Sequence, residues 1–232
     1  METITGSNGI IIPPKGYLPG VRKICDEFGI VMICDEVMAG WCRTGKMFAF
    51  ENFDVVPDIV TFAKGVTCGY VQLGGVAVSK EIAAYFDDNL LSCGLTYSGH
   101  PLACAAGVAC VNYYSKANIL DNVNKVGKVL GEELEALKEK HPCVGDVRYI
   151  GLFSAVELVK DKKTKEALVS YGKDPEGVMG KIIGLLKERK FMTYSHENMI
   201  FVCPPLIITK EQIKEELVKL DEVLSIVDST YI

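Results

Sequence analysis

Two apolar runs decide the fold, and the first reads Ile30-Val31-Met32-Ile33-Cys34-Asp35-Glu36-Val37. An unbroken apolar run of this length is typical of a strand that is covered on both faces inside a parallel sheet. The second run, Asp58 to Ala63, ends on Lys64 in the same way. Ligands of open α/β sheets bind at the carboxyl ends of the strands. Asp35 and Lys64 are therefore predicted to face a common site.

Strand and helix patterns alternate over the first half of the chain. The expected elements are a helix over 19–28, strands over 30–35, 58–63 and 73–78, a short helix capped by Ser79, and a small-residue helix after Pro101. This order is typical of an α/β protein.

The pattern changes after residue 116. Apolar residues recur at helical spacing from Ile119 to Leu137, which predicts a long amphipathic helix. Further elements are expected in this order: a strand over 151–158, a helix opened by Asp174 and Pro175, strands around 191–195 and 199–203, and a last helix after a capping box at Thr209. Residues 117–232 are therefore predicted to form a small α+β domain.

The composition argues against several classes of function. The formal net charge of −5 gives no basic footprint for nucleic acid or for an anionic membrane. The nine cysteines form no C-x-x-C pair, which disfavours structural zinc and disulfides and favours a reducing compartment. No run approaches the roughly 18 apolar residues of a membrane span, and the N-terminus lacks the order of a signal peptide. We expect a cytoplasmic protein that binds no metal, nucleic acid or membrane.

The segment Gly40 to Lys46 has the G-x-x-x-x-G-K spacing of a phosphate-binding loop. Met47 follows it, where that motif needs serine or threonine to bind magnesium. We interpret the segment as a turn-rich loop.

Lys64 and Asp35 each allow two interpretations. A lysine at the end of an apolar strand loses solvation, which favours the neutral amine that attacks carbonyl carbons. Its stem could instead pack on the core while the ammonium group reaches solvent, and Asp35 could simply cap the following turn. Together they suit pyridoxal phosphate, because a carboxylate keeps the pyridine nitrogen protonated and the ring then accepts electrons.

Consecutive blocks of the sequence resemble the class III aminotransferases. In chain order these blocks are Asp35 to Val37, Arg43 to Ala49, Val56 to Val60, Ala63 to Gly65, Leu73 to Gly75, Thr96 to Ala106 and Pro204 to Thr209. The resemblance implies a fold type I transferase with pyridoxal 5'-phosphate as cofactor and a homodimer with active sites at the interface. Residues 1–116 are then the C-terminal part of the large cofactor-binding domain, with a mostly parallel sheet, and residues 117–232 the small C-terminal domain.

The resemblance assigns roles to four residues. Lys64 is the catalytic lysine, which forms the Schiff base with the cofactor and moves the proton. Asp35 pairs with the pyridine nitrogen, and Val37 packs on one face of the ring. Thr96 hydrogen-bonds the cofactor phosphate of the neighbouring subunit.

Three further residues bear on the substrate. Glu2 falls where the family has a glutamate near the substrate. Members that clamp α-amino acids have an arginine about where Phe201 stands, and phenylalanine cannot make a bidentate carboxylate contact. The resemblance therefore favours transfer from a small-molecule ω-amino donor, such as taurine or β-alanine, to a 2-oxo acid such as pyruvate. Arg148 is a candidate for binding an anionic group, the alternative being a surface arginine beside Asp146.

The family normally has about as many residues again ahead of this sequence, including the turn that binds the cofactor phosphate. We therefore expect a C-terminal portion that assembles as a homodimer or with a complementary N-terminal half. The isolated chain is predicted to be a poor enzyme that aggregates or self-associates. The alternatives are an aminomutase or decarboxylase of the same fold, and a truncated chain that assembles with a partner half without catalysis.

Overall fold

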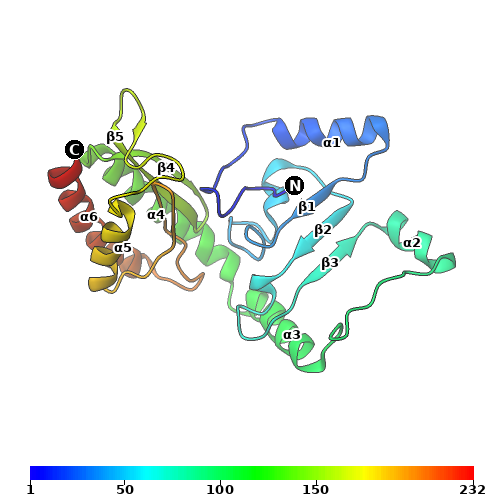
Figure 1. Ribbon diagram of the computed structural model, residues 1–232. Coiled ribbons are helices and arrows are strands. Elements are labelled where there is room, and N and C mark those ends of the chain that lie inside the picture. Colours follow the sequence, from blue (N-terminus) through cyan, green and yellow to red (C-terminus); the bar gives the residue numbers. More distant parts are fainter. The chain divides into compact units, whose positions relative to one another are not determined.

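A computed structural model describes all residues from Met1 to Ile232, and the chain folds into two compact units. The first unit contains residues 1–4 and 12–120, and the second contains residues 5–11 and 121–232. The chain crosses between the units after Ile4, after Ile11 and, last, within the first turn of α4 (Ile119–Lys140), a few residues after the boundary expected from the sequence (Figure 1).

The first unit carries a three-stranded sheet in the order β1-β2-β3. Its elements are α1 (Tyr17–Phe28), β1 (Ile33–Asp35), η1 (Ala49–Phe53), β2 (Ile59–Phe62), η2 (Lys64–Val66), β3 (Gly75–Val78), α2 (Lys80–Asp88) and α3 (Pro101–Lys116). β1 and β2 are parallel, whereas β3 is antiparallel to β2. The connection between β2 and β3 holds only a single short turn of helix, whereas parallel strands are usually joined through an α-helix.

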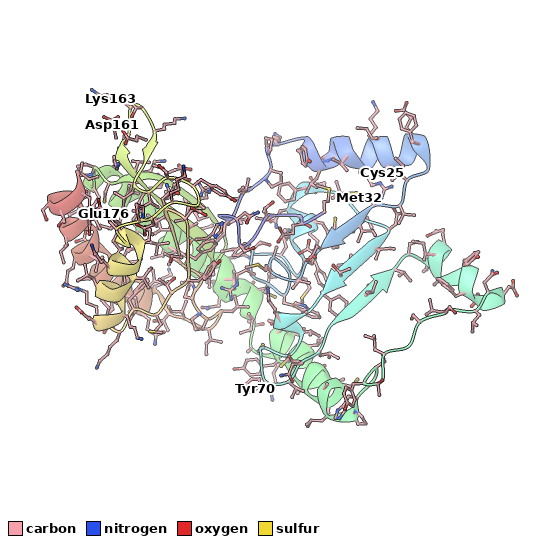
Figure 2. The ribbon with its side chains drawn as sticks, in the orientation of Figure 1. Cys25, Met32, Tyr70, Asp161, Lys163 and Glu176 are labelled. Atoms are coloured by element: carbon pink, nitrogen blue, oxygen red, sulfur yellow. The ribbon has the colours of Figure 1, made fainter.

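The first apolar run differs from the strand predicted over 30–35. β1 begins only at Ile33, and the buried residues of the run are Met32 and Cys34, which pack with Cys25 of α1. Figure 2 shows Cys25 and Met32 beside one another. Three other apolar side chains are exposed: Ile30, Val31 and Ile33. The prediction that both faces are buried was wrong for this chain, because only the side packed against α1 is covered.

The predicted helices of the first unit are confirmed, because their signals are local. The Ser79 hydroxyl accepts a hydrogen bond from the Ile82 amide at 3.3 Å and caps α2. Pro101 is the first residue of α3, a position that suits its missing N–H.

The second unit is a small α+β unit (Figure 1). Besides most of α4 it contains β4 (Val144–Ile150), β5 (Phe153–Asp161), β6 (Glu166–Ala167), α5 (Val178–Glu188), β7 (Ser195–His196), β8 (Met199–Phe201) and α6 (Lys210–Tyr231). The strands pair antiparallel in the order β4-β5-β8-β7, and β6 pairs with β5. The longest helices, α4 and α6, have 22 residues each, and no helix is both long and apolar enough to cross a membrane.

Two helix starts in this unit were predicted from side-chain caps. At α6, the Thr209 amide donates to Gln212 Oε1 at 3.0 Å and the Gln212 amide donates to Thr209 Oγ1 at 3.2 Å, so the capping box is confirmed. At α5, the Asp174 carboxylate accepts from the amides of Val178 and Met179 at 2.7 and 2.9 Å. The helix begins at Val178 rather than at Pro175, because its cap reaches across an intervening turn.

His141 joins the end of α4 to α6. Its ring is buried, with Nε2 2.7 Å from Asp221 Oδ1 and Nδ1 2.6 Å from Asp228 Oδ2. Burial opposes ionisation of Asp221, but hydrogen bonds from Lys140 and His141 outweigh it and lower the pKa of this carboxyl group. Hydrogen bonds from Cys143 and His141 lower the pKa of Asp228 against burial in the same way. The two carboxylates thus face both ring nitrogens of His141 and join the end of α4 to α6.

We expect His141→Ala to reduce the free energy of unfolding by about 2–3 kcal/mol at pH 7, since it removes the ring that contacts two partly buried carboxylates and leaves them only Lys140 and Cys143 as donors. A carboxylate whose folded pKa is depressed contributes stability above its unfolded pKa of about 4, and this is lost as pH falls through the folded value. The difference between wild type and variant should therefore shrink below about pH 4. Urea unfolding at pH 7, 5 and 3.5 measures this difference in the free energy of unfolding, with His100→Ala, at an exposed histidine, as the control. An equal loss of stability at all three pH values would contradict the interaction of His141 with the two carboxylates.

Candidate functional site

Asp35 and Lys64 lie at the carboxyl ends of neighbouring strands. Asp35 is the last residue of β1, and Lys64 follows β2 as the first residue of η2. The two strands are parallel, with Asp35 in register with Thr61. The structure thus places both side chains at the sheet edge where ligands of α/β proteins bind.

Asp35 caps the turn that follows β1. Its Oδ1 accepts a hydrogen bond from the Val37 amide at 2.9 Å, and the residue is half-buried. Glu2 forms an isolated parallel bridge with Asp35. The turn-capping interpretation is therefore correct, and it leaves Asp35 compatible with a second role, because a carboxylate has two oxygens.

Lys64 lines a cavity of about 530 Å³ formed by residues between Ala63 and Gly74. This volume lies within the range of about 300–1,000 Å³ that is usual for small-ligand sites. The side chain is exposed, so the loss of solvation expected from the sequence is not seen in this chain. The physical reason is that Lys64 lies in the η2 turn beyond the strand, not within the apolar run.

Glu36 was missed by the sequence analysis. It is completely buried and accepts hydrogen bonds from Thr3 Oγ1 at 2.6 Å, from the Ala49 amide at 2.8 Å and from the Phe50 amide at 3.0 Å. Burial raises the pKa of this carboxyl group, and the three donors oppose the shift. Glu36 thus ties the turn carrying Asp35 to the N-terminal segment and to η1. Its only sequence signal is its place directly after a buried strand.

The segment from Gly40 to Lys46 is a loop of turns, as interpreted from Met47. The Cys42 amide donates to the Met47 carbonyl at 3.1 Å, and the Gly45 amide donates to the Cys42 carbonyl at 3.0 Å. No α-helix follows at once, as a phosphate-binding loop would require.

The remaining predicted site residues are Val37, Thr96 and Arg148. Val37 is half-buried directly after Asp35, and Thr96 is exposed in the segment between α2 and α3. Arg148 lies on β4 of the second unit, where it donates to the Gly9 carbonyl at 2.8 Å and pairs with Glu157 at 2.5 Å and Asp146 at 3.2 Å. These contacts favour the alternative role of Arg148, that of an arginine with structural partners beside Asp146. No group of three or more His, Cys, Asp or Glu side chains is placed to hold a metal ion.

Comparison with known proteins identifies the family. A model of the family "Aminotransferase class-III" matches residues 1–224. The chain belongs to the class III aminotransferases. It is 35% identical to a taurine–pyruvate aminotransferase of Bilophila wadsworthia over 251 residues, covering 100% of this chain and 52% of that protein. It is 39% identical to an acetylornithine aminotransferase of Caldanaerobacter subterraneus, covering 97% of this chain and 52% of that protein.

A solved structure shares the fold of this class III aminotransferase chain. Taurine:2-oxoglutarate aminotransferase from Bifidobacterium kashiwanohense, in complex with PLP and glutamate, superposes with a TM-score of 0.97 at 57% identity. The match covers 100% of this chain and 52% of that one, so the chain spans about half the length of these relatives and corresponds to their C-terminal half. The predicted family and fold class are confirmed. Class III aminotransferases use pyridoxal 5'-phosphate.

The residues at the strand ends fit that cofactor. Asp35 offers a carboxylate and Lys64 a primary amine, at the ends of adjacent strands. Thr61 Oγ1, in register with Asp35, is buried without a hydrogen-bond partner. An unsatisfied buried hydroxyl costs about 1–3 kcal/mol, so a polar ligand over these strand ends would relieve a real penalty.

Proposed function

We propose that this chain is the C-terminal part of an enzyme that transfers an amino group from an ω-amino donor, such as taurine or β-alanine, to a 2-oxo acid. The observation that carries the proposal is the placement of Asp35 and Lys64 at the carboxyl ends of β1 and β2. The donor class is supported by two relatives that are named for taurine. Their printed acceptors are pyruvate and 2-oxoglutarate, so the acceptor is proposed as a 2-oxo acid.

Four side chains would hold pyridoxal phosphate in this proposal. Lys64 Nζ would bind it covalently, Asp35 would pair with the ring nitrogen, Val37 would pack on the ring, and Thr96 would donate to the phosphate in a neighbouring subunit. When bound, the cofactor withdraws electrons from the substrate carbon that bears the amino group. Lys64 Nζ would remove the proton from that carbon and return it, which its place on the cavity wall allows. The negative charge of Asp35 would keep the ring nitrogen protonated.

The substrate residues are proposed separately. Phe201 is buried in β8 with its ring centroid 5.1 Å from that of Tyr194, so it offers no charge to an α-carboxylate. Glu2 stays a candidate near the substrate through its bridge to Asp35. To bind a substrate anion, Arg148 would have to give up its ion pair with Glu157 or Asp146.

We propose that the first unit assembles further, as a homodimer or with a complementary N-terminal half. Four apolar side chains of this unit support the proposal by their exposure: Val76 61%, Leu90 88%, Leu95 82% and Tyr97 82%. Large apolar side chains left exposed in number are typical of interaction sites in soluble proteins. The isolated chain is accordingly expected to self-associate.

The test of function is a donor profile. The chain is joined to the N-terminal half of the Bifidobacterium relative, and kcat/KM is measured for taurine, β-alanine and ornithine with pyruvate or 2-oxoglutarate. We expect taurine or β-alanine to exceed ornithine by about 10-fold or more, because one charged carboxylate contact contributes about 1.5–3 kcal/mol. Exclusive use of an α-amino acid donor would overturn the donor assignment. Release of carbon dioxide or an isomerised product would indicate a decarboxylase or aminomutase, and a folded but inactive fusion would favour the non-catalytic alternative.

A further inference from the structure

Gly65, which directly follows Lys64, is in contact with two aromatic residues. The hydroxyl of Tyr114, from α3, donates a hydrogen bond to the Gly65 carbonyl at 2.7 Å. Trp41 lies so close that a Cβ built on Gly65 would stand 2.5 Å from Trp41 Cβ and 2.8 Å from its Cγ. Real Cβ atoms do not approach other carbons so closely, so only glycine fits against the indole here.

The two aromatic residues also support each other. Their rings stack with centroids 5.8 Å apart at an interplanar angle of 24°, and Tyr114 and Trp41 are 5% and 8% exposed. Phe48 and Phe62 pack edge-on against Trp41 at 5.3 and 5.4 Å. Tyr114 and Trp41 therefore form a rigid clamp on Gly65, which we call the Gly65 clamp.

The clamp acts on a backbone that needs support. Lys64 has φ of 42°, in the left-handed region that a residue with a Cβ occupies at a cost of about 1–2 kcal/mol. The turns that follow rest on long hydrogen bonds, from the Thr67 amide to the Lys64 carbonyl and from the Cys68 amide to the Gly65 carbonyl, both 3.3 Å. Strained backbone persists only where its surroundings fix it.

The Tyr114 hydroxyl is suited to remain a donor. Burial raises the pKa of Tyr114 far above its ordinary value, and the neighbouring Cys68 thiol adds to the shift. Cys68 Sγ lies 3.4 Å from the hydroxyl oxygen and 3.6 Å from the Gly65 carbonyl oxygen. The raised pKa of Tyr114 thus favours the protonated hydroxyl that donates to the Gly65 carbonyl.

We propose that Tyr114 is a positioning residue, whose hydroxyl, together with the packing of Trp41 against Gly65, fixes the backbone of Lys64 and so the direction of its amine. The inference rests on the function proposed for Lys64. Tyr114 acts through Gly65 and needs no contact with substrate or cofactor.

The test compares Tyr114→Phe with wild type and with Tyr113→Phe, a neighbouring tyrosine of α3 that is 55% exposed. Two quantities are measured on the 232-residue chain: amide hydrogen exchange at residues 66–68, and the rate at which Lys64 is labelled by pyridoxal 5'-phosphate and borohydride, followed by peptide mass spectrometry. We expect Tyr114→Phe to speed exchange and slow labelling by about 3- to 10-fold each, the effect of one neutral hydrogen bond. Tyr113→Phe should change neither.

A second variant perturbs the clamp from the side of Trp41. Gly65→Ala introduces the Cβ that meets the indole, and it should slow labelling at least as much as Tyr114→Phe. Wild-type exchange and labelling rates in both variants, with circular dichroism showing folded protein, would overturn the clamp. If Lys64 of the wild-type chain is labelled no faster than the exposed Lys80, the function proposed for Lys64 is wrong. The amide exchange rates then still show whether Tyr114 and Trp41 fix the backbone at Gly65.

Discussion

Replacing Lys64 with alanine is expected to reduce transamination by the fused protein at least about 10⁴-fold, because in the proposed function this one side chain supplies both the covalent attachment and the proton transfer. Lys64 lines the cavity, and Tyr114 and Trp41 contact Gly65, the residue that follows it. The visible absorbance of the cofactor should shift as well, since without the lysine amine the cofactor would be held non-covalently as its aldehyde. Steady-state rates with taurine and 2-oxoglutarate, and absorbance spectra of the same samples, measure both effects.

The matched control is Lys80→Ala, at an exposed lysine that begins α2. It removes the same charge and should leave rate and spectrum unchanged. Lys64→Arg keeps the positive charge but removes the nucleophile, because a guanidinium stays protonated at any working pH and cannot attack a carbonyl carbon. We expect it to be as inactive as the alanine variant. A Lys64→Ala enzyme retaining a tenth of the wild-type rate would rule out the catalytic role.

The elements with local signals could be predicted from the sequence. Ser79 and Thr209 cap their helices through amides within three residues, so no distant contact is needed. β4 could not be predicted in the same way. The register of its pairing with β5 shifts between Val144 and Asp146, and charged residues occur at alternate positions along it. The pairing with β5, rather than a pattern of its own residues, therefore makes this segment a strand.

In the candidate site, too, residues with a local sequence signal could be predicted, and residues that act through distant contacts could not. The positions of Asp35 and Lys64 at the ends of neighbouring strands could be predicted, because each residue closes an apolar run of the sequence. Glu36 and Tyr114 could not, because the atoms they bind belong to residues far along the chain: Ala49 and Phe50 for Glu36, and Gly65 for Tyr114. The exposure of Lys64 was equally hidden, because it depends on where the strand ends and η2 begins.

Glu36→Ala is expected to lower the stability of the first unit by about 3–5 kcal/mol, the size usual for breaking a buried charged network. The change leaves three donors without an acceptor: the Thr3 hydroxyl and the amides of Ala49 and Phe50. Each buried donor left unsatisfied costs about 1–3 kcal/mol. Glu36→Gln should lose less, because one amide oxygen still accepts, although its NH₂ group then faces a donor.

The pH dependence separates this carboxyl group from ordinary packing. Burial raises the folded pKa of Glu36, so the folded state binds its proton more tightly than the unfolded chain does. The contribution of Glu36 to stability therefore grows as pH falls through the folded pKa and is complete below the unfolded pKa of about 4.3. Glu36→Gln should lack this gain, and the exposed control Glu27→Ala should keep it. Urea unfolding between pH 4 and 8 measures the free energy of unfolding of the three proteins. If the free energy of Glu36→Gln changes with pH in parallel with that of wild type, the pKa of Glu36 does not differ between the folded and unfolded states.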